Sequence, residues 1–361
     1  MKIAIDASRT VQSQKTGVEN YSIKIIQYLL AHAEKIKFTG QIFLYASNSL
    51  PAQWRNFNLH GLKIKIIPFP RLWTHIRLSA ELLRDQPDVF FEPGHVLPFI
   101  HPKNCVITIH DVAFCNLKRL YPKSAYFYLN WSTRFATKYA NKIIVPSQAT
   151  KKDLQKFYRT FENQIEIIPH GFDNLISADK HPRKNRILFI GRIEKKKNLE
   201  RLIEAFVIFS TQHPQWQLVL AGGDGFGAKE IKATAQKIAV AKKIFFPGYI
   251  TEAEKIALLR SAKIFAFPSL AEGFGFPILE AFSADLPVCT ADIPALREVA
   301  GDAAKFVNPY HVKEIADTLN CLANDENLRQ DLIHHGHKQV EKFKWEIAAK
   351  KTWEILTTIQ N

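Results

Sequence analysis

Short apolar runs of strand length recur along the chain, and most are followed by a turn and a longer amphipathic segment. Runs such as "KIAID" (2–6), "CVITIH" (105–110) and "RILFIG" (186–191) are continuously apolar over most of their length. Such runs predict strands buried on both faces, and helices between them predict parallel pairing. The sequence therefore predicts an α/β fold built on parallel sheets.

A polar stretch, "SADKHPRKNR" (177–186), interrupts this pattern once and predicts a linker. A chain of 361 residues is long enough for two domains. We expect two tandem Rossmann-like doubly wound domains that face a cleft, where ligands bind beyond the carboxyl ends of the strands. The predicted boundaries are 1–178 for an N-terminal domain, 179–186 for the linker, 187–345 for a C-terminal domain, and 346–361 for a final helix that packs back on the N-terminal domain.

Four cations follow the first strand of the second half, in "RILFIGRIEKKKNLERLIEAF" (186–206). A lysine run is often no more than a solvated loop. Here the run lies at the carboxyl end of a strand, where clustered cations repel one another unless an anion neutralises them. We expect Arg192 and Lys197 to bind such an anion.

A glycine-rich turn follows the next predicted strand. Gly223, Gly225 and Ala228 match the permissive dinucleotide pattern G-x-G-x-x-G/A. The following strand ends in Pro247–Gly248 and lacks the acidic residue that would hold the ribose of NAD, which argues against a dehydrogenase. Gly223 is still expected to allow close approach of a nucleotide, although a tight turn alone would explain it.

Two glutamates bracket another glycine-containing turn, in "SLAEGFGFPILEA" (269–281). Gly273 and Gly275 permit backbone conformations that expose successive N–H groups, and Pro277 suits the first turn of a helix. A helix N-terminus binds phosphate, while Glu272 and Glu280 can accept hydrogen bonds from hydroxyl groups. The stretch predicts a sugar-nucleotide site, with two surface glutamates beside a loop as the alternative.

These segments together resemble glycosyltransferase family 4, whose members are retaining enzymes with the GT-B fold. The 269–281 stretch resembles the family's E-x7-E signature, and Gly191–Asn198 is similar to its G-R-x4-K-N segment. "IPHGFD" (168–173) resembles its I-P-N-G-V-D segment, with His170 in place of the usual asparagine. The remaining similar segments are "TGVENY" (16–21) and, typical of a mannosyltransferase-like branch, "HDVAF" (110–114) and "VPSQATKKDL" (145–154).

The resemblance implies a role for each matching position. Arg192 and Lys197 would bind the donor diphosphate, Glu280 the nucleotide ribose, and His110 the transferred sugar. The alternative for His110 is a buried histidine bonded to the backbone. Gly17 would close over the diphosphate from the first loop. The residues expected at the donor sugar, distal phosphate and nucleotide are Glu272, Gly273, Phe274, Gly275, Phe276, Gly223 and Tyr249.

The resemblance implies a retaining glycosyltransferase that moves a hexose, with mannose favoured, from a GDP- or UDP-linked sugar. The acceptor would be a glycan or a lipid-linked glycan in cell-surface polysaccharide synthesis. Because the chain has no D-x-D motif, we expect no metal and no cofactor beyond this co-substrate. Cationic side chains and helix N–H groups would meet the leaving phosphate instead. Two alternatives stay open: a GT-B sugar-nucleotide epimerase, and a non-catalytic protein that binds nucleotides or nucleic acid.

Positive charge is concentrated in the first half of the chain. Residues 1–180 contain 24 lysines and arginines against 13 acidic residues, whereas 181–361 contain 25 against 21. Cations and aromatics alternate in Leu117–Lys142 and Arg71–Arg84, although most of these rings are expected to face the sheet.

The N-terminus predicts a strand and not a signal peptide, and no apolar stretch is long enough to span a membrane. We expect a cytoplasmic protein that binds peripherally to the anionic inner face of the cell membrane, with no nucleic-acid partner; a soluble anionic acceptor is the alternative.

Overall fold

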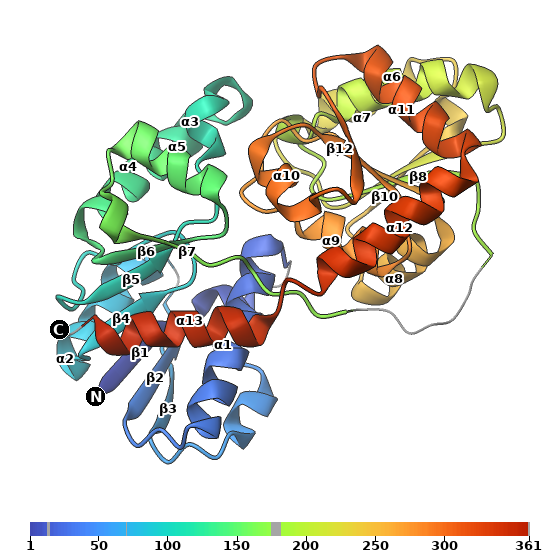
Figure 1. The fold of residues 1–361 in the computed structure, drawn as a ribbon. Helices are drawn as coiled ribbons and strands as arrows, with labels where there is room; N and C mark the ends of the chain where they lie inside the picture. The colour runs from blue at the N-terminus through green and yellow to red at the C-terminus, as the bar shows by residue number, and fades with distance from the viewer. Residues whose placement is uncertain (13–14, 70, 175–181, 360–361) are drawn as a thin grey trace. The chain divides into compact units, whose positions relative to one another are not determined.

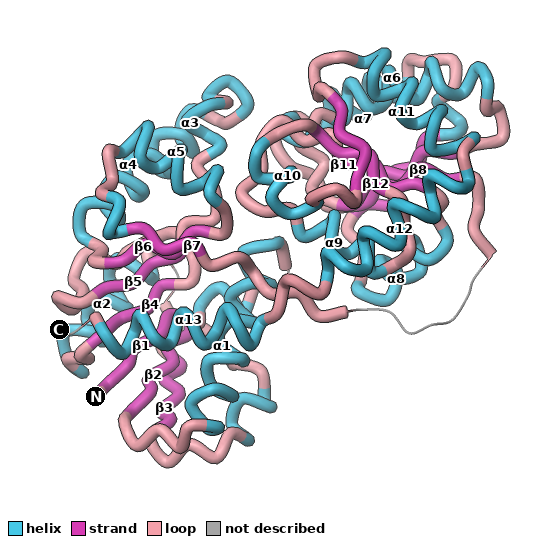
Figure 2. The backbone as a smooth tube through the Cα atoms, viewed as in Figure 1, coloured by secondary structure: helices cyan, strands magenta, loops and turns pink. Residues whose placement is uncertain are grey.

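The chain folds into two compact α/β units. The structure is a computed structural model that describes residues 1–12, 15–69, 71–174 and 182–359. Figure 2 shows the strands of each unit gathered into a sheet with helices around it. The first unit comprises Met1–Cys115, Lys123–Gly171 and the segment from Phe343 onward, and the second comprises Asn116–Pro122 and Phe172–Lys342.

Seven parallel strands form the sheet of the first unit, in the order β3-β2-β1-β4-β5-β6-β7. Every residue of β4 and β5 is buried, as expected for strands covered on both faces. Strand order reverses between β1 and β4, and ligands of doubly wound folds bind at such a switch point. The strands are β1 (Lys2–Asp6), β2 (Gln41–Ala46), β3 (Leu62–Ile66), β4 (Val89–Glu92), β5 (Cys105–Thr108), β6 (Lys142–Val145) and β7 (Ile165–Ile167).

Helices of several types connect these strands. The α-helices are α1 (Gly17–Lys35), α2 (Ser79–Asp85), α3 (Ala113–Asn116), α4 (Lys123–Tyr139), α5 (Gln148–Tyr158) and α13 (Trp345–Thr358). A π-helical turn, Trp73–Leu78, leads into α2. Short 3₁₀ helices occupy Ser8–Val11, Ala52–Asn56, Lys118–Leu120 and Glu162–Gln164.

The helix α13 follows the second unit in the chain but packs on α1 of the first (Figure 1). Its Trp345 stacks on Tyr28 at a ring distance of 6.2 Å, and Trp353 meets Phe38 edge-on at 5.0 Å. Gly171 allows this approach, because a Cβ there would lie 2.3 Å from the backbone nitrogen of Trp345. Buried aromatic area of this kind fixes the helix on the first unit.

Six parallel strands form the second sheet, in the order β10-β9-β8-β11-β12-β13, with its switch point between β8 and β11. The strands are β8 (Arg186–Ile190), β9 (Gln217–Ala221), β10 (Ile244–Gly248), β11 (Ile264–Phe267), β12 (Val288–Ala291) and β13 (Ala304–Val307). The helices are α6 (Leu199–Gln212), α7 (Ala228–Gln236), α8 (Glu252–Ser261), α9 (Phe276–Ser283), α10 (Pro294–Ala300), α11 (Val312–Asn324) and α12 (Glu326–Val340), with 3₁₀ turns at Lys195–Lys197 and Ala241–Lys243.

The predicted α/β class with two parallel sheets is confirmed. The units divide the chain differently from the predicted domains at three places. Asn116–Pro122 groups with the second unit, the second unit begins again at Phe172, and the first unit resumes at Phe343. Of the predicted linker at 179–186, residues 179–181 lie outside the described residues, and Arg186 already belongs to β8.

Four of the six aromatic residues of α4 are exposed, and Tyr126 and Phe135 are half-buried, so the prediction that most of these rings pack against the sheet is wrong for this helix. Its buried residues are small: Ser132, Thr133, Ala136 and Thr137. Large aromatic side chains on the opposite face are exposed, and Trp131 among them has an exposed fraction of 43%. The small residues lie on one face at helical spacing. Ser132 and Thr137 donate to carbonyls of the helix itself, while the Thr133 hydroxyl bonds the ring of His95 at 2.7 Å. This helix therefore buries its small polar face and exposes its aromatic one.

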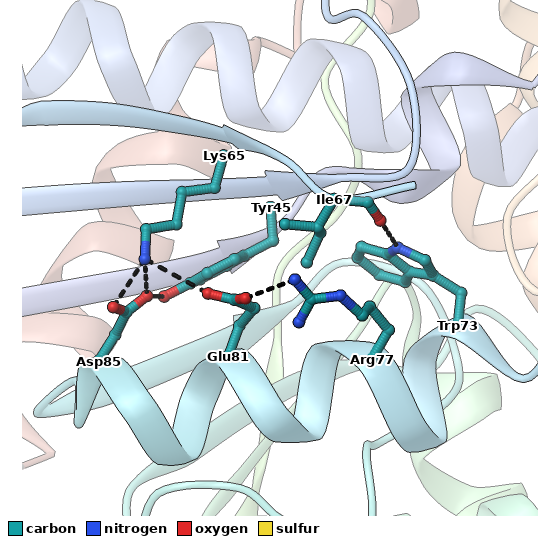
Figure 3. A network of polar contacts seen from close by, with 7 residues as sticks. All are labelled: Tyr45, Lys65, Ile67, Trp73, Arg77, Glu81 and Asp85. Carbon is teal, nitrogen blue, oxygen red and sulfur yellow. Dashed lines mark hydrogen bonds and ion pairs between the residues drawn. The ribbon is translucent and has the colours of Figure 1, made fainter. Parts of the chain in front are cut away.

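A polar network ties α2 to the sheet of the first unit (Figure 3). The Lys65 ammonium on β3 lies 2.6 Å from Asp85 and 3.4 Å from Glu81, and the Tyr45 hydroxyl donates to Asp85 at 2.7 Å. Hydrogen bonds from Lys65 and Tyr45 outweigh burial and lower the pKa of Asp85. The network therefore needs an ionised Asp85.

The same network holds two residues of the predicted membrane-facing segment Arg71–Arg84. The Arg77 guanidinium pairs with Glu81 at 2.7 Å, and the Trp73 indole donates to the carbonyl of Ile67 at 2.8 Å (Figure 3). Arg77 and Trp73 thus have structural roles within the first unit. Within the described ranges, no helix is long and apolar enough to cross a membrane.

Candidate functional site

The switch point of the second sheet brings a lysine and a glutamate together. Lys197 lies in the loop after β8, and Glu272 in the loop after β11. Their side chains are mostly buried and form an ion pair with Nζ 2.5 Å from Oε1. The Lys197 ammonium also lies 5.2 Å from the ring centre of Phe267, within cation–π range. Lys197, which the sequence predicted to bind an anion, is therefore held in place by Glu272 on the neighbouring loop.

Asn198 fixes the positions of these loops. It adopts a left-handed conformation, with φ of 61°, and it is buried. Its side-chain amide donates to the carbonyls of Pro268 and Pro309, at 3.1 and 2.6 Å, while Arg201 donates to its oxygen. Asparagine suits this conformation, and its amide satisfies buried carbonyls that would otherwise be costly.

The predicted helix start near Pro277 is found in α9, which begins at Phe276. Gly275 caps this helix with φ of +115°, a conformation that favours glycine, and a Cβ there would lie 2.7 Å from Leu296. Phe274 and Phe276 meet edge-on at 5.2 Å. The turn brings Gly273 to Phe276, the backbone predicted to hold a phosphate and sugar, to the start of an eight-residue helix.

Glu280, predicted to hold a ribose, pairs with Lys255 of α8 at 2.6 Å. Burial disfavours the charged ammonium, but Glu280 and Glu252 outweigh it and raise the pKa of Lys255. Both side chains of the pair are largely buried, with exposed fractions of 12% for Lys255 and 13% for Glu280. Lys255 thus holds the carboxylate of Glu280 in a fixed position.

The glycine turn after β9 contacts the loop after β8. The N–H of Ile193 donates to the carbonyl of Gly223 at 2.9 Å. The closest approach belongs to Gly222, which has φ of +146° and whose Cβ would lie 2.0 Å from the carbonyl oxygen of Gly191. The Gly222 N–H donates to Gly248, so the loop carrying the half-exposed Tyr249 lies next to this turn.

The second unit therefore gathers most of the predicted donor residues at one edge of its sheet. Arg192, just beyond β8, is exposed there. The predicted residues of this edge are Arg192, Lys197, Gly223, Tyr249, Glu272 and the turn Gly273–Phe276, with Glu280 inside α9.

The first unit holds His110 and Gly17. The His110 ring uses both nitrogens within the protein: Nε2 lies 3.0 Å from the carbonyl of Pro93, and Nδ1 lies 3.1 Å from Nε2 of His170. Because a carbonyl only accepts, Nε2 of His110 carries the proton and His170 donates to Nδ1. Burial lowers the pKa of His110 to about 4 and lowers that of His170 well below 6.5, so both rings are neutral at pH 7.

Tyr21 of α1 supports this histidine pair. Its ring lies 4.8 Å from that of His110 and 4.3 Å from that of His170, and its hydroxyl bonds Thr108 at 3.1 Å. His170, in place of the family's usual asparagine, therefore orients His110 as part of a buried aromatic group.

A pair of buried carboxyl groups lies at the switch point of the first sheet. Asp6 ends β1 and Glu92 ends β4, both about 2% exposed, and they share a hydrogen bond. The Gly94 N–H donates to Glu92 at 2.7 Å. Burial and the charge of Asp6 raise the pKa of Glu92 well above its usual value. Burial and the mutual repulsion of the two carboxylates therefore both favour a proton shared by the pair.

The N-terminus of α1 lies at the same edge. Gly17 is its first residue, and the Glu19 carboxylate accepts from the Thr16 N–H at 3.0 Å, half of a capping box. The guanidinium of the partly exposed Arg9 lies 3.7 Å from Glu19. This edge thus presents a helix N-terminus and an arginine, both suited to a negatively charged group.

Sequence reasoning missed five residues that shape the two edges. The sequence could have indicated Asn198 and Tyr21, because Asn198 ends the segment that resembles G-R-x4-K-N and Tyr21 ends "TGVENY". Arg9 lies just past the first strand. Lys255 and Gly222 gave no signal, because their partners lie far away in the sequence.

Two family models match the chain: Glycosyltransferase Family 4 over residues 17–174 and Glycosyl transferases group 1 over residues 173–339. The O-antigen chain mannosyltransferase B of Escherichia coli is 25% identical over 98% of both chains. The O-antigen chain mannosyltransferase RfbU of Salmonella typhimurium is 24% identical over 81% of this chain and 83% of its own. The solved structure of WaaG, a glycosyltransferase involved in lipopolysaccharide biosynthesis, covers 99% of this chain and 100% of its own, with a TM-score of 0.74 at 18% identity. That likeness confirms the predicted GT-B fold.

Proposed function

The chain belongs to glycosyltransferase family 4, and from this premise we propose that it transfers a hexose from a nucleoside-diphosphate sugar to a glycan or lipid-linked acceptor. Mannose is the favoured hexose, because the two mannosyltransferases above align with most of this chain. Both act on O-antigen chains according to their names, which supports a role in the synthesis of a cell-surface polysaccharide.

The ion pair of Lys197 with Glu272 carries this proposal. An ammonium has three N–H donors, and the contact with Glu272 uses one of them. The others can bind the donor diphosphate, with the exposed Arg192 beside it at the same sheet edge. The second carboxylate oxygen of Glu272 can accept hydrogen bonds from the sugar hydroxyls. One ion pair can therefore bind both the diphosphate and the sugar of the donor.

The reaction follows from the charge that develops. Cleavage of the bond between the anomeric carbon and phosphate leaves new negative charge on a nucleoside diphosphate. We expect Lys197, Arg192 and the N–H groups at the start of α9 to stabilise it, and a preorganised donor is typically worth about 3–4 kcal/mol. We infer a metal-independent reaction with retention, in which the leaving phosphate helps to deprotonate the acceptor on the same face of the sugar.

The roles of the remaining residues complete the proposal. Glu280, fixed by Lys255, holds the ribose hydroxyls. Gly17, at the start of α1, closes over the diphosphate, and His110 contacts the transferred sugar. Since both ring nitrogens of His110 already bond within the protein, its contact uses the carbon edge of the ring. The acceptor is held at the inner face of the cell membrane.

A donor panel tests the function. The purified chain is incubated with GDP-mannose, UDP-glucose and related donors, with and without mannose-terminated acceptors, and both released nucleotide and product are measured. We expect acceptor-dependent turnover of one donor, and proton NMR should show an anomeric configuration equal to that of the donor. Conversion of a donor into another sugar nucleotide without acceptor would identify an epimerase. Binding of no donor at all would overturn the proposal.

A further inference from the structure

We propose that α4 and the loop after β4 form a surface that docks on an anionic lipid bilayer, with exposed rings at the headgroup level and a basic groove around the lipid phosphates. This inference deepens the proposed function and rests on its lipid-linked acceptor. The surface has two parts, an aromatic ledge and a basic groove, which share residues of α4.

Ring contacts run through most of the aromatic ledge, from Phe99 to Tyr139. Trp131 lies 5.8 Å from Phe99 and 5.9 Å from Phe135, and Phe135 lies 4.7 Å from Tyr139. His75 supports the ledge from below, stacked on Phe99 at 4.3 Å. We define the ledge as Phe99, Ile100, Phe127, Tyr128, Trp131, Phe135 and Tyr139.

The ledge is exposed to an extent that is unusual for such large rings. Phe127 is 67% exposed, Phe99 51% and Trp131 43%. On α4 the rings recur every fourth residue, from Phe127 to Tyr139, which places them along one side of the helix. Since the small residues of α4 fill its buried face, the rings have no place in the core of this unit. A contiguous apolar patch of this kind marks an interaction site.

The basic groove lies along the same helix. It has a volume of about 680 Å³, and none of the described residues that line it is acidic. The exposed cations Arg134 and Lys138 of α4 line it together with Arg159, which follows α5. Arg134 and Lys138 lie between the rings of the ledge in sequence, so the cations adjoin the aromatics.

Local charge identifies the partner. The two parts of this region that belong to the first unit, Pro93–Cys115 and Lys123–Lys142, have five lysines and arginines and a single acidic residue, Asp111, and of these cations Lys142 pairs with Glu166. Tryptophan and tyrosine favour the boundary between lipid and water, because each has an apolar ring and a polar group. Cations beside such rings add attraction to anionic headgroups. An apolar protein partner would match the rings but would leave the neighbouring cations unpaired.

The segment Arg71–Arg84 contributes less than its sequence predicts, since Arg77 pairs with Glu81 and Trp73 bonds the sheet. The test therefore uses α4. The full-length protein is floated with vesicles of phosphatidylcholine alone or mixed with phosphatidylglycerol. We expect flotation only with phosphatidylglycerol, and less of it as salt rises, because ions screen the attraction.

Two double variants separate the parts of the surface. Arg134→Gln with Lys138→Gln should lower the partition coefficient about fivefold for each cation removed. Phe127→Ser with Trp131→Ser should lower it at least tenfold, because exposed rings that enter the lipid gain apolar burial. The matched controls lie in the second unit: Lys237→Gln with Lys242→Gln, and Ile208→Ser with Tyr310→Ser. Both controls should bind like the parent, and thermal midpoints should show that all variants fold.

Donor turnover with a water-soluble acceptor is measured in parallel, without vesicles. If the parent protein turns over donor but does not float with phosphatidylglycerol, the docking surface is wrong and the function stands. If it floats but turns over no donor, the function fails and the surface stands. A third outcome would show that the ledge binds a second copy of the chain. The parent would not float with vesicles, and Phe127→Ser with Trp131→Ser would change the oligomeric state measured by light scattering. That result would overturn the proposal.

Discussion

The ion pair with Glu272 holds the Lys197 ammonium at the sheet edge where the proposed donor diphosphate would bind. We expect Lys197→Ala to lower kcat/KM by about 10²–10³, the usual effect of removing one preorganised donor. Lys195→Ala, in the same loop but beside Phe226, is the matched control. Near-parental turnover by Lys197→Ala, measured by nucleotide release, would remove this residue from the mechanism.

Glu280 and Glu272 should differ in which part of the donor they hold. Glu280→Ala should weaken binding of both the free nucleoside diphosphate and the sugar nucleotide, measured by calorimetry. Glu272→Ala should chiefly weaken the sugar nucleotide. Lys255→Met should resemble Glu280→Ala in a milder form, because it frees the carboxylate from its fixed position. Equal losses for both ligands in both glutamate variants would contradict this division.

The histidine pair predicts a loss of stability in acid. His110 and His170 stay neutral in the folded state, because burial lowers their pKa values, whereas the unfolded chain takes up protons near 6.5. The folded state therefore binds fewer protons below about pH 7, and the free energy of unfolding falls from there towards pH 4.

Urea unfolding at pH 7 and at pH 4.5 measures this effect. His170→Asn, which removes one titrating group, should make the loss between the two pH values smaller. His60→Asn, at an exposed position, is the control. An unchanged loss in His170→Asn would show that the pair does not titrate as inferred.

How far the site follows from sequence depends on where each residue finds its partner. Lys197 and Glu272 were predictable, because strand ends in a parallel sheet meet at one edge. Their mutual contact was not, since it joins loops 75 positions apart. The pairing of Glu280 with Lys255 and the hydrogen bond between Asp6 and Glu92 depend on the same kind of tertiary proximity.

At the scale of elements, the strands were predictable because they are short apolar runs buried on both faces. The orientation of α4 was not. Rings at every fourth position and small residues between them predict an amphipathic helix, but hydrophobicity alone assigns the rings to the core. In the structure the face of small residues is buried instead. This is possible because the hydroxyl of a serine or threonine can donate a hydrogen bond to a carbonyl of the same helix.

The contact between Gly171 and α13 predicts a sharp steric effect. Gly171→Ala would place a methyl group 2.3 Å from the Trp345 backbone, so α13 must shift away from α1. We expect the free energy of unfolding to fall by about 1–3 kcal/mol, as overpacking does. A thermal midpoint for Gly171→Ala equal to that of the parent would contradict the contact.

At the scale of the whole molecule, the charges proposed for the reaction all come from the chain. We therefore expect turnover to survive EDTA, with the same kcat/KM as in untreated protein. The control adds Mg²⁺ or Mn²⁺ after chelation, which should change nothing. Activity lost in EDTA and restored by either ion would show that a metal takes part and that Lys197 and Arg192 are not sufficient.

The place of α13 in the first unit has a consequence for synthesis on the ribosome. The second unit, up to Lys342, emerges complete before α13 does, whereas α1 emerges early and waits for its partner helix. The domain that is begun first is therefore finished last. Until then the surface of α1 around Tyr28 and the neighbouring Phe38 lacks its tryptophans, and a nascent chain at this stage is a natural client for a chaperone that binds aromatic segments.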